Sequence, residues 1–193
     1  MCCQYGYLPG TLDDIYDITE DVSEDALRVP FGDIRPSDNA VIIKKEPQKL
    51  LCASAMPWGF LSFDKKLLIN ARAETVFEKK SFAESALKRR CIIPAACFYE
   101  WDRDKVKNTF MLSDHTPLFL AGFYNMFDGA DRFIIITTEA NETMAPVHDR
   151  MPLIFEKEEI EPWIFNDSDA RELLKKTPAP LERTPEYEQL SLF

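Results

Sequence analysis

Short runs of apolar, β-branched and aromatic residues dominate the middle of the chain. Such runs are typical of strands, and they occupy residues 40–43, 91–94, 97–101, 117–124 and 132–138. Helical patterns are shorter: the sequence predicts helices over 81–90, 139–144 and 169–176, with a weak amphipathic pattern over 11–27. Ser81 and Glu84 form a predicted capping box for the helix over 81–90. Because strands outnumber helices and mix with them irregularly, the pattern indicates an α+β fold.

The length of 193 residues is enough for one domain with a substantial core. We expect this domain to span residues 2–176. Residues 177–193 are expected to form a tail punctuated by Pro178, Pro180 and Pro185. No apolar run approaches the roughly 18 residues that a membrane helix needs, and we expect no secretory signal and no membrane partner.

The number and spacing of the cysteines and histidines indicate the redox compartment of the protein and whether it binds a metal. The five cysteines are scattered, which favours reduced thiols in the cytoplasm over a disulfide framework. There are only two histidines, and Cys2 and Cys3 are adjacent rather than spaced as metal ligands usually are. We therefore expect no metal site and no cofactor.

The net charge of −10 argues at first against a nucleic-acid partner. The charge is unevenly distributed, however: residues 11–25 hold seven acids and no bases, whereas residues 26–155 hold 18 bases and 16 acids. A local basic groove is compatible with this distribution, and so is an ordinary solvated surface.

The beginning of the chain carries distinctive chemistry. Removal of Met1 before a residue as small as Cys2 would leave an N-terminal cysteine, with an amine and a thiol on adjacent carbons. The amine can condense with an aldehyde to an imine, and the thiol can then close a thiazolidine ring. Both groups titrate near neutrality, with ordinary pKa values of about 8 and about 8.5.

Four segments place polar groups beside turns and strand ends, where functional residues concentrate. They are Pro57–Phe60, Ile69–Thr75, Arg90–Trp101 and Thr137–Pro152. Each has an ordinary structural interpretation as well: Glu100 could face solvent from an alternating strand, His148 could be a core histidine, Asn70 a turn residue, and Arg72 a partner of Glu74.

Together these segments resemble the SRAP (SOS response-associated peptidase) family, in matching order over roughly residues 2–165. The resemblance implies an α+β fold around a mixed or antiparallel β-barrel-like core with short peripheral helices. It also implies binding to single-stranded DNA and a covalent cross-link to abasic sites, which would place the protein at the nucleoid when it is bound. By motif position, Cys2 would be the nucleophile with Asn70, Glu100 and His148 around it, while Trp58, Arg72, Arg150 and Trp101 would contact DNA.

These assignments fit ordinary chemistry. Glu100 and His148 are candidates for the proton transfers, Asn70 can hold the amine or the aldehyde oxygen, and the arginines suit bidentate phosphate contacts. The chain departs from the family where Cys3 and Gln4 replace the usual Gly-Arg and Cys97 replaces a glycine. The missing arginine removes one expected phosphate contact.

The end of the chain reads Gln189-Leu190-Ser191-Leu192-Phe193. It resembles the short peptide that binds the bacterial sliding clamp, with Gln189, Leu190, Leu192 and Phe193 as the anchoring residues. The alternative is an apolar tail folded back onto the domain.

Two other functions remain open at this level. Cys2, His148 and Glu100 could form a cysteine-type hydrolase, or Cys2 could be an N-terminal nucleophile whose own amine is the base. Alternatively, the arginines and aromatic residues could make a non-covalent single-strand-binding module.

Overall fold

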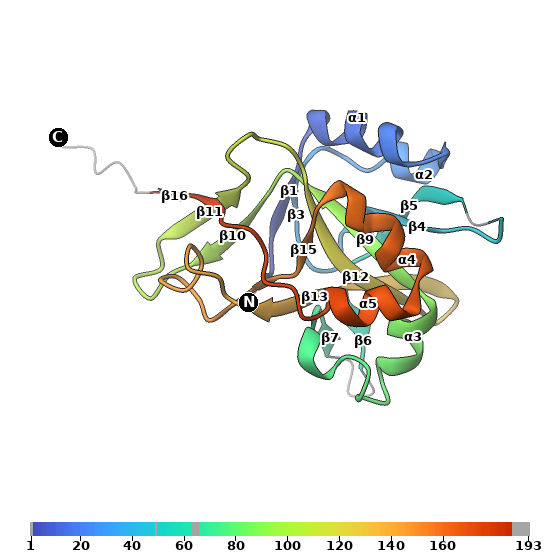
Figure 1. Ribbon diagram of the computed structural model, residues 1–193. Coiled ribbons are helices and arrows are strands. Elements are labelled where there is room, and N and C mark those ends of the chain that lie inside the picture. Colours follow the sequence, from blue (N-terminus) through green and yellow to red (C-terminus); the bar gives the residue numbers. More distant parts are fainter. Residues whose placement is uncertain (1, 49, 63–65, 187–193) are drawn as a thin grey trace.

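The structure of the protein is a computed structural model that describes residues 2–48, 50–62 and 66–186 (Figure 1). Strands and short helices are mixed along the chain, which confirms the α+β class expected from the sequence. No helix among these residues is long and apolar enough to cross a membrane.

The larger sheet has nine strands and carries most of the core. Along its main path the strands follow the order β14 (Arg150–Pro152), β13 (Ala130–Glu139), β12 (Leu118–Phe127), β9 (Arg90–Ala95), β4 (Asn39–Lys45), β5 (Leu51–Pro57) and β2 (Asp21–Val22). Off this path, β15 (Ile154–Phe155) pairs with β12, and β8 (Asn70–Arg72) runs parallel to β13. All six residues of β9 are buried, as expected for a strand near the middle of a sheet covered on both faces.

The smaller sheet has five strands. Their order is β16 (Glu182–Glu186), β11 (Lys107–Met111), β10 (Cys97–Trp101), β1 (Tyr5–Tyr7) and β3 (Gly32–Ile34). A separate two-stranded hairpin joins β6 (Phe60–Leu61) to β7 (Leu67–Leu68). Both main sheets are open along the described part of the chain, so the barrel-like core expected from the family takes the form of two sheets without a closing strand pair.

Short helices cover the sheets at their periphery. They are α1 (Pro9–Ile18), α2 (Glu24–Leu27), α3 (Ala83–Lys88), α4 (Ile160–Phe165) and α5 (Asp167–Leu173), with 3-10 turns η1 (Ala73–Thr75) and η2 (Lys157–Glu159). Helices α1 and α2 lie together on one side of the molecule, and α3, α4 and α5 lie on another (Figure 1).

Three helix predictions need correction. Helix α3 is shorter than the predicted 81–90, and no side chain among the described residues caps its first turn. The predicted helix over 139–144 is instead a turn, and α5 begins two residues earlier than expected because Asn166 caps it by accepting hydrogen bonds from Ser168 N and Asp169 N.

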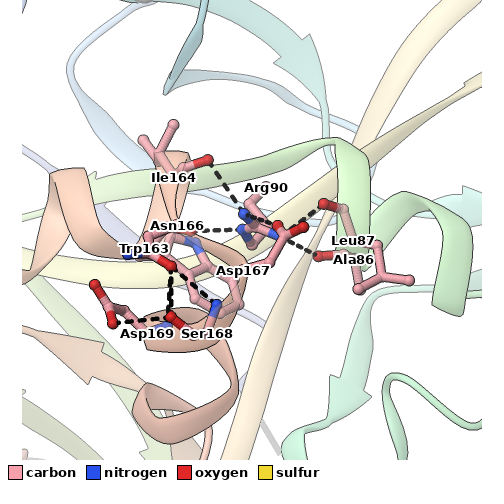
Figure 2. Close-up of polar contacts among 9 residues, drawn as sticks. All are labelled: Ala86, Leu87, Arg90, Trp163, Ile164, Asn166, Asp167, Ser168 and Asp169. Atoms are coloured by element: carbon pink, nitrogen blue, oxygen red, sulfur yellow. Dashed lines mark hydrogen bonds and ion pairs between the residues drawn. The ribbon is translucent and has the colours of Figure 1, made fainter.

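A buried arginine joins two of the helices to the large sheet. The Arg90 side chain is 2% exposed, and its guanidinium donates to the carbonyls of Ala86 and Leu87 in α3 and of Trp163 and Ile164 in α4 (Figure 2). These carbonyls lie at helix C-termini, where they lack helical partners and attract a cation. A fifth contact reaches the carboxylate of Asp167 at 2.8 Å.

The first part of the expected tail is folded onto the domain. Strand β16 pairs with β11 from Lys107↔Glu186 to Met111↔Glu182, and Leu181 is buried. The described part of the predicted tail is therefore attached to the domain, because residues 182–186 are part of the small sheet. Gln189, Leu190, Leu192 and Phe193 lie outside the described residues.

Candidate active site

Antiparallel pairing brings the start of the chain beside Glu100. Strand β1 pairs with β10 at Tyr5↔Phe98, and Tyr99 N donates to Gln4 O at 3.1 Å. Continuing this register toward the N-terminus places Cys3 opposite Glu100. Cys2 is 0% exposed and Glu100 is 4% exposed, so both lie inside the protein.

Asn70 reaches the same point from the other sheet. It begins β8, which runs parallel to β13 with Asn70 opposite Ile135. Its side-chain Nδ2 donates to Cys2 O at 2.8 Å across 68 residues of sequence. The structure thus connects Asn70 directly to Cys2.

Burial controls the protonation of the thiols. Burial raises the pKa of the Cys2 thiol well above its ordinary value, and the nearby Glu100 carboxylate raises it further. The pKa of Cys3 is raised for the same two reasons. Both side chains are therefore neutral thiols near pH 7.

His148 follows the turn that connects β13 to β14. Its Nδ1 lies 2.9 Å from Arg150 N and also 2.9 Å from an Asp149 carboxylate oxygen. Because Arg150 N donates to Nδ1, this arrangement places the ring proton on Nε2. That Nε2–H is the group available for chemistry.

His148 and Trp101 line the same cavity of about 450 Å³. Trp101 ends β10 directly after Glu100 and is 37% exposed, so this cavity borders the strand that carries the buried carboxylate. Convergence of His148 on Cys2 itself stays a prediction.

The two predicted phosphate-binding arginines flank the end of β13. Arg72, on β8, lies opposite Thr137 of β13, and Arg150, on β14, lies opposite Glu139 of β13. Both arginines line a cavity of about 490 Å³. Arg72 makes no hydrogen bond or ion pair with any described residue, and it is exposed.

Arg150, unlike Arg72, is bound by other residues of the protein. Its Nη1 and Nη2 donate to the two carboxylate oxygens of Glu74 at 2.7 and 3.0 Å, and Nη2 also donates to Thr137 O at 2.6 Å. Partial burial acts to raise the pKa of Glu74, but the hydrogen bonds from Arg150, a backbone hydrogen bond and the charges of Arg150 and Arg72 together lower it. The sequence analysis did not predict this pair, and it offered Arg72 only as an alternative partner of Glu74.

Trp58 is a core residue. It is 0% exposed, its ring packs against Tyr5 at 5.4 Å and Phe133 at 6.3 Å between centroids, and its Nε1 donates to Ile69 O. The expectation that Trp58 stacks on a DNA base is corrected here, because the ring presents no accessible face. Trp101 is the exposed aromatic residue at this edge.

The family departures form one polar cluster. Gln4 donates from Nε2 to Asp33 at 2.6 Å instead of pointing a cation at a phosphate. Cys97 lies beside Gly6, where an added Cβ would approach Cys97 Sγ to 2.8 Å. A larger residue at position 6 would therefore require the Cys97 side chain to move.

The residues that the structure describes are 2–48, 50–62 and 66–186. No group of three or more His, Cys, Asp or Glu side chains in these ranges could hold a metal ion.

Solved structures share this fold. A crystal structure of a protein from Bordetella bronchiseptica superposes with a TM-score of 0.80 at 24% identity and covers 96% of this chain and 100% of its own. A second, from Bacteroides thetaiotaomicron, has a TM-score of 0.77 at 21% identity, covering 97% of this chain and 93% of its own.

Curated relatives are similar in sequence. The chain is 35% identical over 152 residues to "Abasic site processing protein YoqW" of Bacillus subtilis (strain 168), covering 70% of this chain and 66% of that protein, slightly less than two thirds. It is 32% identical over 170 residues to YoaM of the same organism and 27% identical over 165 residues to YedK of Escherichia coli (strain K12), both of which carry the same description. These alignments cover 79% and 81% of this chain and 74% of each relative.

The family model described as "SOS response associated peptidase (SRAP)" matches residues 1–190, which is almost the whole sequence. This chain belongs to the SRAP family.

Proposed function

We propose that this protein processes abasic sites in single-stranded DNA by linking itself to them through Cys2. The contact between Asn70 Nδ2 and Cys2 O, beside the buried Glu100, is the observation that best supports this function. Membership of the SRAP family and the printed descriptions of its relatives support the same class of substrate.

The chemistry begins after Met1 is removed and the Cys2 nitrogen becomes an α-amine. The neutral amine attacks the aldehyde carbon of the open-chain sugar, and loss of water gives an imine. The thiol sulfur then adds to the imine carbon while its proton is transferred to the nitrogen. The product is a thiazolidine ring, and water is the only leaving group.

Three side chains serve these steps. Glu100 takes the proton that the amine must lose before it attacks. His148 Nε2–H can protonate the departing hydroxyl. Asn70 fixes the Cys2 carbonyl, which restricts rotation of the reacting residue.

DNA is held at the edge next to this site. Arg72 offers an unoccupied guanidinium for a phosphate, and Trp101 offers an exposed ring for a base, a contact that contributes about 1–3 kcal/mol per base in single-strand-binding proteins. Arg150 contributes to this contact only if a phosphate replaces Glu74 as its partner or binds the guanidinium together with Glu74. Single-stranded DNA suits the site because no duplex has to be opened.

The state of the Cys2 thiol argues against the peptidase alternative. Cysteine hydrolases use a thiolate, which needs a pKa below the ordinary value. In the chain that still carries Met1, burial and Glu100 raise the pKa of Cys2. A neutral thiol is better suited to add second, after the amine has formed an imine.

Mass spectrometry with abasic single-stranded DNA tests the proposal. The protein with a verified Cys2 N-terminus should form a stable adduct with loss of one water, and Cys2→Ala should form none. Cys2→Ser keeps the amine but lacks the sulfur, so it should give an adduct only when the imine is trapped by borohydride reduction.

Cys3→Ala is the matched control and should still cross-link. An undiminished stable adduct in Cys2→Ala would exclude Cys2 as the nucleophile. Turnover of peptides without any adduct would favour the hydrolase, and a gel shift without an adduct would favour the non-covalent binding module.

Beyond residues 182–186, which belong to the small sheet, we propose a second, separate contact at the end of the chain. We expect Gln189, Leu190, Leu192 and Phe193 to bind a bacterial sliding clamp, which would deliver a cytoplasmic protein to DNA at the nucleoid. Deleting residues 189–193 should abolish retention by purified clamp in a pull-down and leave cross-linking unchanged. Equal retention of both forms would exclude the tail as the contact.

A further inference from the structure

Asn141 uses the full hydrogen-bonding capacity of its side chain. Its Oδ1 accepts from Thr143 N at 3.1 Å and Met144 N at 3.0 Å, and its Nδ2 donates to Pro178 O at 3.2 Å and Ala179 O at 2.8 Å. An asparagine amide has two lone pairs and two N–H groups, so all four are engaged. The residue is 7% exposed.

The two sides of this amide belong to different parts of the chain. The oxygen side holds the turn that leads to His148, whose own N–H donates to Met144 O at 3.1 Å. The nitrogen side holds the start of the C-terminal segment, 37 and 38 residues away in sequence. Asn141 thus fixes the His148 turn against the C-terminal segment.

The C-terminal segment also reaches the strand that carries Glu100. Beyond Ala179 it forms β16, in which Arg183 Nε donates to Asn108 Oδ1 at 2.8 Å. Asn108 is fully buried and lies directly opposite Glu100 in the β10–β11 register. Residues paired across an antiparallel ladder lie on the same face of the sheet, with their Cβ atoms about 5 Å apart. The segment therefore packs against both regions that supply proton-transfer groups.

We propose that Asn141 is a positioning residue that sets the place of the His148 ring for cross-link formation, with residues 178–186 as its fixed support. This inference rests on the function proposed above. Asn141 touches no reacting atom, and its effect on the reaction passes through His148.

Two substitutions keep the oxygen side of the amide and remove its nitrogen side. Asn141→Ser keeps an oxygen that can accept from the turn N–H groups but is too short to reach Pro178 and Ala179. Asn141→Asp also keeps the acceptor and sets a carboxylate oxygen against two carbonyl oxygens. Each variant should slow adduct formation at saturating abasic DNA by about tenfold, because a misplacement of about 1 Å can cost up to about 10² in rate.

The decisive comparison uses His148→Asn as a second background. If Asn141 acts through His148, each Asn141 variant should change the rate by less than about twofold once His148 is absent. DNA affinity should stay unchanged in both backgrounds, and the part of the pH–rate profile that His148→Asn removes should be weakened in Asn141→Ser. A tenfold loss in both backgrounds would overturn the proposal.

Asn39→Asp is the charge-matched control, since Asn39 is exposed at the start of β4 and should leave the rate unchanged. Amide exchange gives a readout that does not depend on the reaction: Met144 and His148 N–H groups should exchange faster in Asn141→Ser. Unchanged exchange would overturn the positioning role, whereas an adduct missing from the wild-type protein would contradict the proposed function alone.

Discussion

Two arginines of this chain are each paired with a carboxylate, yet their surroundings differ. Arg90 is 2% exposed and also binds four backbone carbonyls, so its guanidinium is saturated by the scaffold (Figure 2). Arg150 is 12% exposed, is held mainly by the side chain of Glu74, and borders a cavity that it shares with Arg72.

The difference teaches how to separate structural from functional cations. Helix carbonyls cannot leave Arg90 without unfolding part of the chain. The Glu74 carboxylate is 44% exposed and can be exchanged for another anion of similar geometry, such as a phosphate. Arg90 is therefore a scaffold residue, whereas Arg150 has a partner that can be exchanged, and we predict that a DNA phosphate takes the place of Glu74.

The largest effect is expected from Arg90→Ala. It leaves four carbonyls at helix C-termini without their donor, and buried groups that lose a partner cost about 1–3 kcal/mol each before water or relaxation compensates. We expect a loss of about 3 kcal/mol in the free energy of unfolding, as found for other disrupted buried networks. Chemical denaturation measures it.

Arg28→Ala is the control for that measurement. Arg28 forms an exposed i,i+4 pair with Glu24, so its loss should change stability by less than about 0.5 kcal/mol. Equal effects at the two positions would contradict the scaffold role of Arg90.

Sequence motifs predicted the residues of the site better than their partners. Cys2, Asn70 and Glu100 come from separate segments, and the strand pairings account for how they meet. The partner of Arg150 was not predictable, because Glu74 is 76 residues away in sequence. Arg72 is only two residues from Glu74, which made it an alternative partner for that carboxylate. Ion pairs across a fold follow from tertiary geometry, which local spacing does not encode.

The same limit explains the errors at Trp58 and at the turn over 141–148. Gly59 has φ +108° and closely faces Leu67, so the Trp58–Gly59 bend is packed beneath the β6–β7 hairpin. Nothing in the Pro57–Phe60 motif distinguishes such a buried bend from an exposed loop. The predicted helix over 139–144 fails because Asn141 caps the backbone locally, an alternative that asparagine often offers to helix formation.

The second effect concerns DNA binding by Arg150. Arg150→Gln removes a cation and leaves Glu74 as an unpaired anion facing DNA, so we expect about a tenfold loss of affinity for single-stranded DNA of any sequence, or about 1.4 kcal/mol. Adding Glu74→Gln should recover part of that loss. In contrast, adding Asp167→Asn to Arg90→Ala should restore none of the lost stability. DNA titrations at several salt concentrations test the first pair, and chemical denaturation tests the second.

A smaller effect is expected from Glu74→Gln alone. The substitution removes the anion that competes with phosphate, so affinity for single-stranded DNA should rise by about threefold, and its salt dependence should steepen by about one unit of slope. Glu78→Gln, on the same segment, is the control. If affinity falls instead, Glu74 orients Arg150 rather than competing for it.

The smallest effect is expected at Asp167, the carboxylate of the scaffold arginine. Hydrogen bonds from Arg90 lower the pKa of Asp167, so its contribution to stability is present above its ordinary pKa and is lost as pH falls through the lowered value. Because the carboxylate is 70% exposed, solvent screening limits this contribution to a few tenths of a kcal/mol, at the low end of about 0–1 kcal/mol for surface pairs. Asp167→Asn should therefore destabilise the protein slightly at pH 7 and remove the corresponding loss of stability that occurs as pH falls through the lowered pKa. A loss close to that of Arg90→Ala would mean that the carboxylate, rather than the helix carbonyls, holds Arg90 in place.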